Sequence, residues 1–128
     1  MTWLGRTLIA GMLLLIDPVA EAAANQFTIY LTQDDPAVLK KAISSAANVE
    51  TYFRAKGEDA RVEIVAAGSG VNLLRADRSP LIPQINAAAQ NPAIHFSVSD
   101  ESLQAIAVKE GIRPPLPDSV EIVRSASE

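Results

Sequence analysis

The side chains that could supply a nucleophile and its base are the hydroxyl of Ser99 and the ring of His95, the only histidine. A serine attacks only when a base lies within hydrogen-bond reach and donors stabilise the oxyanion. His95 lies within an expected strand and Ser99 lies just beyond its end, four positions later, which separates them by about 13 Å at about 3.3 Å per residue if the chain is extended. We therefore expect Ser99 to cap the following helix and His95 to be a strand residue whose ring has a partner.

Sulfur is almost absent from the chain. There is no cysteine, and the two methionines are Met1 and Met12, both close to the N-terminus. A chain without thiols has no thiolate nucleophile, no disulfide and no thiolate metal ligand. Any activity of the rest of the chain has to depend on oxygen and nitrogen groups.

Three aspartates, Asp34, Asp35 and Asp100, follow expected strands and could converge at one edge of a sheet. Carboxylate oxygens are suitable ligands for hard cations, but the spacing of these residues does not match a calcium-binding loop. Aspartate is also a preferred residue at helix N-termini. We expect two of the three to cap helices, and the sequence predicts neither a metal nor a cofactor.

Gly68, Ser69 and Gly70 form a G-x-G sequence directly after an expected strand. Glycines at such a junction permit positive φ and close backbone approach, so the segment could present N–H groups to an anion or form a tight turn. The tight turn is the favoured interpretation. Asn48, on the first expected helix, faces either the crevice at the strand ends or solvent, and the sequence leaves both open.

The charge of the chain argues against a nucleic acid partner. The net charge is −4, and removal of residues 1–24, which hold one arginine and two acids, changes it to −3. Binding to a phosphate backbone requires clustered lysine and arginine. The basic residues that lie near one another are expected on solvated faces: Lys40, Lys41, Arg75 and Arg78.

The first 24 residues have the pattern of a secretory signal peptide. Arg6 precedes an apolar run at residues 7–16, and small residues suitable for cleavage follow at 20–24. A membrane-spanning helix needs about 20 apolar residues, which is longer than this run. We predict cleavage after Ala22 or Ala24 and a periplasmic or secreted protein.

The remainder, residues 25–128, is predicted to be one domain with alternating strands and helices. Apolar, β-branched runs predict strands at residues 27–31, 61–67, 93–98 and 119–123. Helical spacing predicts helices at residues 36–56, 71–76, 81–89 and 101–110. This order is typical of a three-layer α/β/α fold with a mostly parallel sheet of about four strands, whose ligand sites lie at the carboxyl ends of the strands.

Residues 27–124 resemble the DsrE/DsrF-like (YchN-like) family, which includes sulfur-relay subunits. The resemblance rests on Asp34-Asp35-Pro36, on Asn48 and above all on the segment VEIVAAGSGVNLLRADRSPLIPQI at residues 62–85. Members that carry sulfur have a cysteine after the third strand, where this chain has Ser99. A serine cannot form a persulfide, so the resemblance does not extend to sulfur transfer by this chain alone.

The resemblance implies an exported, non-catalytic binding or assembly subunit, in a homo-oligomer or a hetero-oligomer with related subunits. The candidate site for a small anion or a partner's loop combines the residues named above: Gly68, Ser69, Gly70, Ser99, Asp100, Asp34, Asp35 and Asn48. Two alternatives stay open. A cysteine-bearing partner could supply the thiol in a mixed sulfur-relay ring, or Ser99 and the aspartates could serve a hydrolase or transferase.

Overall fold

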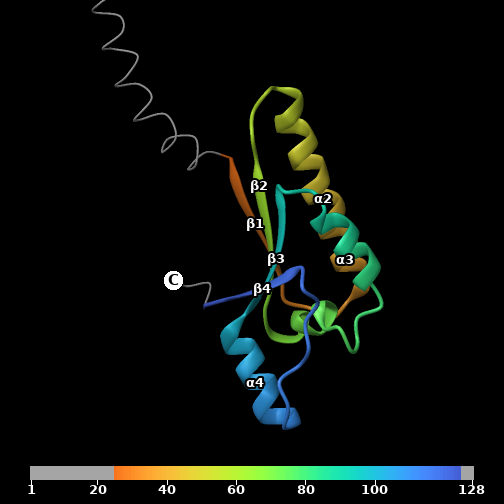
Figure 1. Cartoon of the computed structure of the whole chain (residues 1–128), viewed down its shortest axis with the longest axis vertical. Coiled ribbons are helices and arrows are strands. Elements are labelled where there is room, and N and C mark those ends of the chain that lie inside the picture. Colours follow the sequence, from red (N-terminus) through yellow and green to blue (C-terminus); the bar gives the residue numbers. More distant parts are fainter. Residues whose placement is uncertain (1–24, 125–128) are drawn as a thin grey trace, which may run out of the picture.

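The computed structural model describes residues 25–124, so the predicted signal peptide lies outside the described residues (Figure 1). The strands and helices alternate along the chain. In order they are β1 (Gln26–Leu31), α2 (Pro36–Ala55), β2 (Arg61–Ala66), the 3₁₀ helix η1 (Gly68–Leu74), α3 (Ile82–Ala89), β3 (Ile94–Ser99), α4 (Asp100–Glu110) and β4 (Val120–Val123).

The four strands form one parallel sheet in the order β1-β2-β3-β4. Successive side chains of a strand point to opposite faces, and the register places Ile64 beside Phe96. Both side chains are fully buried, with Val62, Ala66 and Val98 on the same face. The predicted α/β class, with a parallel sheet of four strands and helices packed around it, is confirmed.

The opposite face of β2 and β3 carries paired polar groups. Arg61 Nη1 lies 2.7 Å from His95 Nε2, and the Ser97 hydroxyl donates to Glu63 Oε2 at 2.6 Å. The expectation that the His95 ring has a partner is confirmed. Ser97 is fully buried, so its hydrogen bond removes the cost of an unsatisfied hydroxyl.

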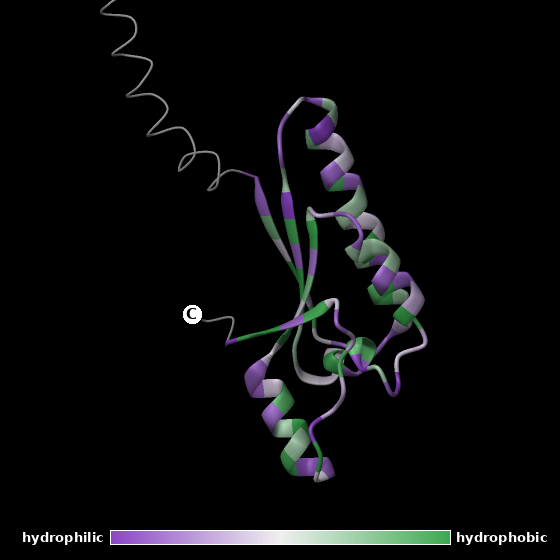
Figure 2. Ribbon diagram, in the orientation of Figure 1, coloured by the Kyte–Doolittle hydropathy of each residue, from purple (hydrophilic) through white to green (hydrophobic). Residues whose placement is uncertain are grey.

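Helix α2 begins where the sequence predicts. The Asp35 carboxylate accepts from Ala37 N at 3.0 Å, and Pro36 stands at the first helical position, where a missing N–H costs nothing. Figure 2 shows hydrophobic and hydrophilic residues alternating along this helix, the pattern of an amphipathic surface helix. Its apolar stripe packs on β1 and β2 and alongside α3, and it buries Leu39, Ala42 and Ala46.

The G-x-G sequence forms the expected tight turn, which Gly70 N closes by donating to the Ala67 carbonyl at 3.1 Å. The same sequence opens η1, a 3₁₀ helix that stands in place of the helix expected at residues 71–76. The two glycines are required for different reasons. Gly68 has a φ of +57°, which an L-residue rarely adopts. A Cβ on Gly70 would lie 2.2 Å from the Leu31 carbonyl oxygen. The 3₁₀ conformation of η1 therefore depends on its close approach to the end of β1, which a side chain at position 70 would prevent.

Helix α4 extends beyond the carboxyl ends of the strands, whereas α2 and α3 lie together along one side of the sheet (Figure 1). The proline-containing segment at residues 113–117 contains no helix, in agreement with its three prolines, and leads back to β4. Within residues 25–124, no helix is both long and apolar enough to cross a membrane.

Candidate functional site

A cavity of about 330 Å³ lies between η1 and α4, at the carboxyl ends of the strands. In parallel α/β sheets this edge is the usual location of ligand sites. One wall comes from η1 and the segment after it, and the other from α4. The lining residues are Gly68, Ser69, Asn72 and Arg78 on the first wall and Ser102, Ala105, Ile106, Lys109 and Glu110 on the second.

The η1 wall is fixed by hydrogen bonds to both neighbouring elements. Gly68 N donates to Ser102 Oγ of α4 at 2.9 Å, and the Ser69 hydroxyl donates to the Thr32 carbonyl after β1 at 3.1 Å. Gly70 N donates to the Ala67 carbonyl at 3.1 Å. The N–H groups of both glycines therefore have partners within the protein and do not form a cradle for an anion.

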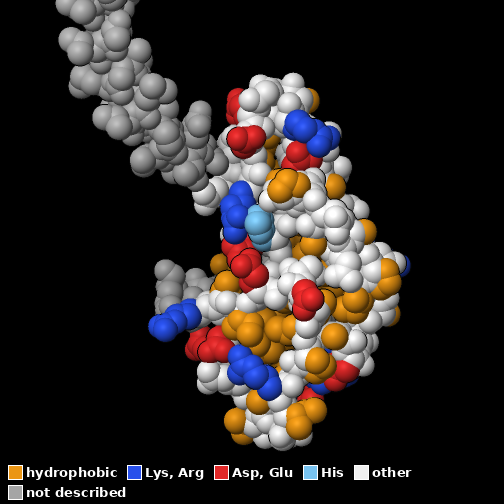
Figure 3. Space-filling model, viewed as in Figure 1, with side chains coloured by type: hydrophobic (Ala, Val, Ile, Leu, Met, Phe, Trp, Pro, Cys, Tyr) orange, Lys and Arg blue, Asp and Glu red, His pale blue; other side chains and the backbone are white. Residues whose placement is uncertain are grey.

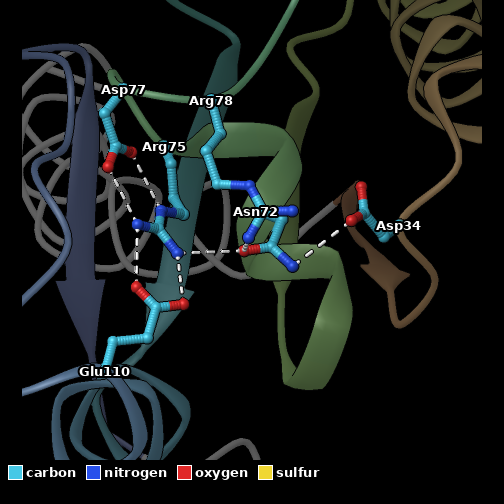
Figure 4. A network of polar contacts seen from close by, with 6 residues as sticks. All are labelled: Asp34, Asn72, Arg75, Asp77, Arg78 and Glu110. Carbon is cyan, nitrogen blue, oxygen red and sulfur yellow. Dashed lines mark hydrogen bonds and ion pairs between the residues drawn. The ribbon is translucent and has the colours of Figure 1, made fainter.

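Arg75 lies at the centre of the polar network behind the cavity (Figure 4). Its Nε and Nη2 donate to the two carboxylate oxygens of Asp77 at 2.9 and 2.8 Å. Its Nη1 and Nη2 donate to the two carboxylate oxygens of Glu110 at 2.9 and 3.1 Å, and Nη1 also donates to Asn72 Oδ1 at 3.2 Å. All five N–H groups of the guanidinium thus have an acceptor.

The network shifts the pKa values of Arg75, Asp77 and Glu110 so that each charged form is favoured. The hydrogen bonds that Arg75 donates to Asp77 and then to Glu110 raise the pKa of Arg75 above its usual value. In return, the hydrogen bonds from Arg75 lower the pKa of Asp77 and of Glu110. The sequence suggested that Arg75 lies on a solvated face. In the structure only 3% of its surface is exposed, so it is buried instead. The prediction for Arg75 is wrong because its side chain runs inward between η1 and α4.

Asn72 connects this network to the cavity and to the end of β1. Its Oδ1 accepts from Arg78 Nη1 at 3.4 Å as well as from Arg75, and its Nδ2 donates to Asp34 Oδ2 at 3.3 Å. Figure 4 shows Arg78 alongside Asn72. Asn72 therefore orients Arg78, one of the two cationic side chains of the cavity.

The second cation is Lys109, which is exposed and has no ion pair with any residue between 25 and 124. Arg78 is exposed as well, and Asn72 is its hydrogen-bond partner in this part of the chain. The acid in the lining, Glu110, is paired with Arg75. Neither cation forms an ion pair with a described carboxylate, and the charge of Arg78 helps to lower the pKa of Asp77 and of Glu110.

The structure separates the residues that the sequence grouped as a candidate site. Gly68 and Ser69 line the cavity, Asp34 reaches it through Asn72, and Gly70 is buried. The others have different positions. Asp35 caps α2 and Ser99 caps α4. Asp100 accepts from Arg113 at 3.0 Å and from Gln104 at 2.7 Å. Asn48 is exposed and lies about 18 Å along α2 from the first residue of that helix.

Ser99 is a capping residue, as predicted. Its Oγ accepts from Ser102 N at 3.4 Å, and the residue is only 6% exposed. The ring of His95 is held by Arg61 instead. The three aspartates likewise have separate partners, and residues 25–124 contain no cluster of three His, Cys, Asp or Glu side chains that could hold a metal ion.

Sequence reasoning missed Arg78 and Lys109 as site residues and Arg75 as their support. Arg75 follows Leu73 and Leu74, both buried, and precedes Asp77 by two positions. This order places a carboxylate near the arginine in the sequence, but it does not indicate that the pair is buried. No comparable signal exists for Lys109, since one exposed lysine on a helix is commonplace.

The fold and this edge site define a parallel α/β domain with a cavity at the carboxyl ends of its strands. No family model and no curated protein matches the chain. Among solved structures it is similar to a protein of unknown function, MTH1491 from Methanobacterium thermoautotrophicum. The two are 24% identical, the match covers 80% of this chain and 85% of that one, and the TM-score is 0.66. This similarity shows the fold alone.

Proposed function

We propose that this chain is a non-catalytic binding subunit that holds a small anion in the cavity between η1 and α4. The observation that carries the proposal is the pair of cations, Arg78 and Lys109, in a cavity whose acid is already paired with Arg75. An anion near both cations gains charge-assisted hydrogen bonds, which are about twice as strong as neutral ones. Asn72 and Arg75 support the site by orienting Arg78 and engaging Glu110.

The proposed site differs from the one that the sequence suggested. The N–H groups of Gly68 and Gly70 have internal acceptors. The first turn of α4 already contains Asp100 and Glu101, whose negative charges interact with the helix N-terminus. Side-chain cations, rather than backbone N–H groups, are therefore the anion ligands in this proposal.

Calorimetric titration with inorganic phosphate and sulfate at low salt tests the proposal. Arg78→Gln and Lys109→Gln should each weaken binding about tenfold, since a charge-assisted hydrogen bond contributes about 1.5 kcal/mol. Lys41→Gln is the matched control, because Lys41 is an exposed lysine of α2 outside the cavity. Absence of binding by the wild type, or equal losses in all three variants, would refute the proposal.

The link to sulfur metabolism rests on the family resemblance and enters the proposal only through a partner. Because Ser99 cannot carry a persulfide, we propose that any sulfur relay uses a thiol from a cysteine-bearing subunit in a mixed ring. Ser99→Ala should then reduce ligand binding at most several-fold. Purification from the native host with identification of bound proteins separates a mixed ring from a homo-oligomer.

The hydrolase alternative needs a base near Ser99 Oγ, and the described contact of this hydroxyl is its helix cap.

Assembly with other subunits is part of the same proposal. β1 and β4 are the edge strands of the sheet, and unpaired strand edges favour association. Ile122 of β4 is half exposed, and Figure 3 shows a hydrophobic patch over the region where β4 lies. Light scattering on the mature chain tests this part, and a monomer at all concentrations would contradict it.

N-terminal sequencing of the exported protein tests cleavage before Asn25.

A further inference from the structure

We infer that the ligand of the cavity between η1 and α4 is an organic anion with an apolar portion, rather than a bare inorganic ion. The inference rests on the proposed function and specifies the class of ligand. It depends on the order of the side chains along the α4 wall, on the position of the cations at one end of the cavity, and on its volume.

The α4 wall has an ordered chemistry. Ser102, Ala105, Ile106 and Lys109 are spaced as i, i+3, i+4 and i+7, so they lie on one face of the helix. From Ser102 to Lys109 this face extends for about 10 Å at 1.5 Å per residue. Along it a hydroxyl is followed by two apolar side chains and then by a cation.

The two cations lie at the same end of the cavity. Lys109 precedes Glu110, and Glu110 binds Arg75. Arg75 shares the Asn72 Oδ1 acceptor with Arg78. Gly68 and Ser102 are hydrogen-bonded to each other at the opposite end of this face of α4, about 10 Å along the helix from Lys109. A ligand with its anionic group between Arg78 and Lys109 would therefore place the rest of its atoms against Ala105 and Ile106.

The volume of the cavity leads to the same conclusion. A water molecule occupies about 30 Å³, so a phosphate ion with five heavy atoms fills only a minor part of about 330 Å³. Cavities of about this size usually bind small organic molecules. Ala105 and Ile106 provide no hydrogen bonds for the water that would otherwise fill the space, and an apolar group that displaces this water gains affinity.

The test is a calorimetric titration of the mature chain with inorganic phosphate, methyl phosphate, butyl phosphate and butanol. We expect affinity to rise about threefold to fourfold for each added methylene between methyl and butyl phosphate, because each buried methylene is favourable by this factor. Butanol should not bind measurably, since it lacks the anionic group. Arg78→Gln should weaken all three phosphates by a similar factor.

Substitutions at two exposed positions of α4, one in the cavity wall and one outside it, isolate the apolar contact without loss of the fold. Ala105→Gln should lower the affinity for butyl phosphate at least fivefold and leave that for inorganic phosphate unchanged. Val108→Gln is the control, because Val108 is 86% exposed on the same helix and does not line the cavity. Equal affinities for inorganic and butyl phosphate would overturn this inference and leave the proposed function standing. Failure of every phosphate to bind would overturn both, and binding of butanol as tight as that of butyl phosphate would overturn the anionic component.

Discussion

Helices α2 and α4 are attached to the same sheet by different forces. α2 has 20 residues and buries Leu39, Ala42 and Ala46 against the sheet, whereas α4 has 11 residues and buries only Leu103. Burial of apolar surface is nearly independent of pH and is not weakened by salt. The difference indicates that α2 is a structural element and that α4 depends on its polar contacts.

Three polar contacts connect α4 to the rest of the domain. Ser102 accepts from Gly68 N near the start of the helix, and Glu110 binds Arg75 at its end. Asp100 pairs with Arg113 in the segment that leads to β4, at 3.0 Å. Gly68, Ser102 and Glu110 of these contacts also line the cavity. The site is therefore carried by a helix that has one buried side chain and is held by polar contacts. Binding sites often lie in such regions of lower local stability.

The largest expected effect comes from a deletion in the α2 interface. Leu39→Ala removes a fully buried side chain and leaves a cavity, so the free energy of unfolding should decrease by about 3 kcal/mol. Urea denaturation followed by circular dichroism measures this loss. A decrease below about 1 kcal/mol would show that α2 is not held mainly by apolar burial.

Removal of the central cation should affect the α4 region next most strongly. Arg75→Ala eliminates five hydrogen bonds, and we expect a loss of about 2 kcal/mol, moderated because Asp77 and Glu110 become hydrated. Amide hydrogen exchange should accelerate in α4 and η1 more than in α2. Arg54→Ala is the matched control, because Arg54 is 68% exposed and its helical i,i+4 pair with Glu50 contributes about 0.5 kcal/mol or less. Similar effects of the two substitutions would contradict the comparison.

Acid should weaken the attachment of α4 selectively. Folding lowers the pKa of Asp77 and Glu110, so their contribution is complete above the ordinary values of 3.8 and 4.5 and is lost as the pH falls through the lowered values. The stability of the wild type should therefore fall below about pH 4.5 more steeply than that of Glu110→Gln. Urea denaturation at a series of pH values measures both curves, and parallel curves would refute the role of Glu110.

The smallest effect is expected at the outer surface of α4. Val108→Ser should change the free energy of unfolding by no more than about 0.5 kcal/mol, because Val108 is 86% exposed and contributes little to packing. Thermal denaturation of this variant provides the measurement. A larger loss would mean that the outer face of α4 is covered in solution, which would support assembly of subunits through this helix.

The elements that could be predicted from the sequence are those with local signals. The apolar stripe from Leu39 to Phe53 and the Asp35-Pro36 start predicted α2 well, and the predicted strand positions agree with the structure to within a residue or two. η1 was less predictable, since its 3₁₀ conformation depends on the contact between Gly70 and the end of β1. That contact joins residues far apart in the sequence and has no local pattern.

The candidate site was only partly predictable for the same reason. Gly68 and Ser69 were identified because they follow a strand, and strand ends meet at one edge of a parallel sheet. Arg78 and Lys109 lie on different elements and share a cavity only after α4 has packed against η1. No spacing along the chain relates two cations that are separated by α3, β3 and most of α4.

By itself the sequence determined the α/β class, the order of the elements, and the absence of thiol chemistry, because periodicity and composition are local properties. Only the tertiary structure decided that Arg75 is buried and that Glu110 forms an ion pair with it. It also decided that Arg78 and Lys109 share one cavity with the apolar side chains of Ala105 and Ile106. These facts depend on which side chains meet in space, and a charged side chain has no sequence signature that states whether its partner will be water or another residue.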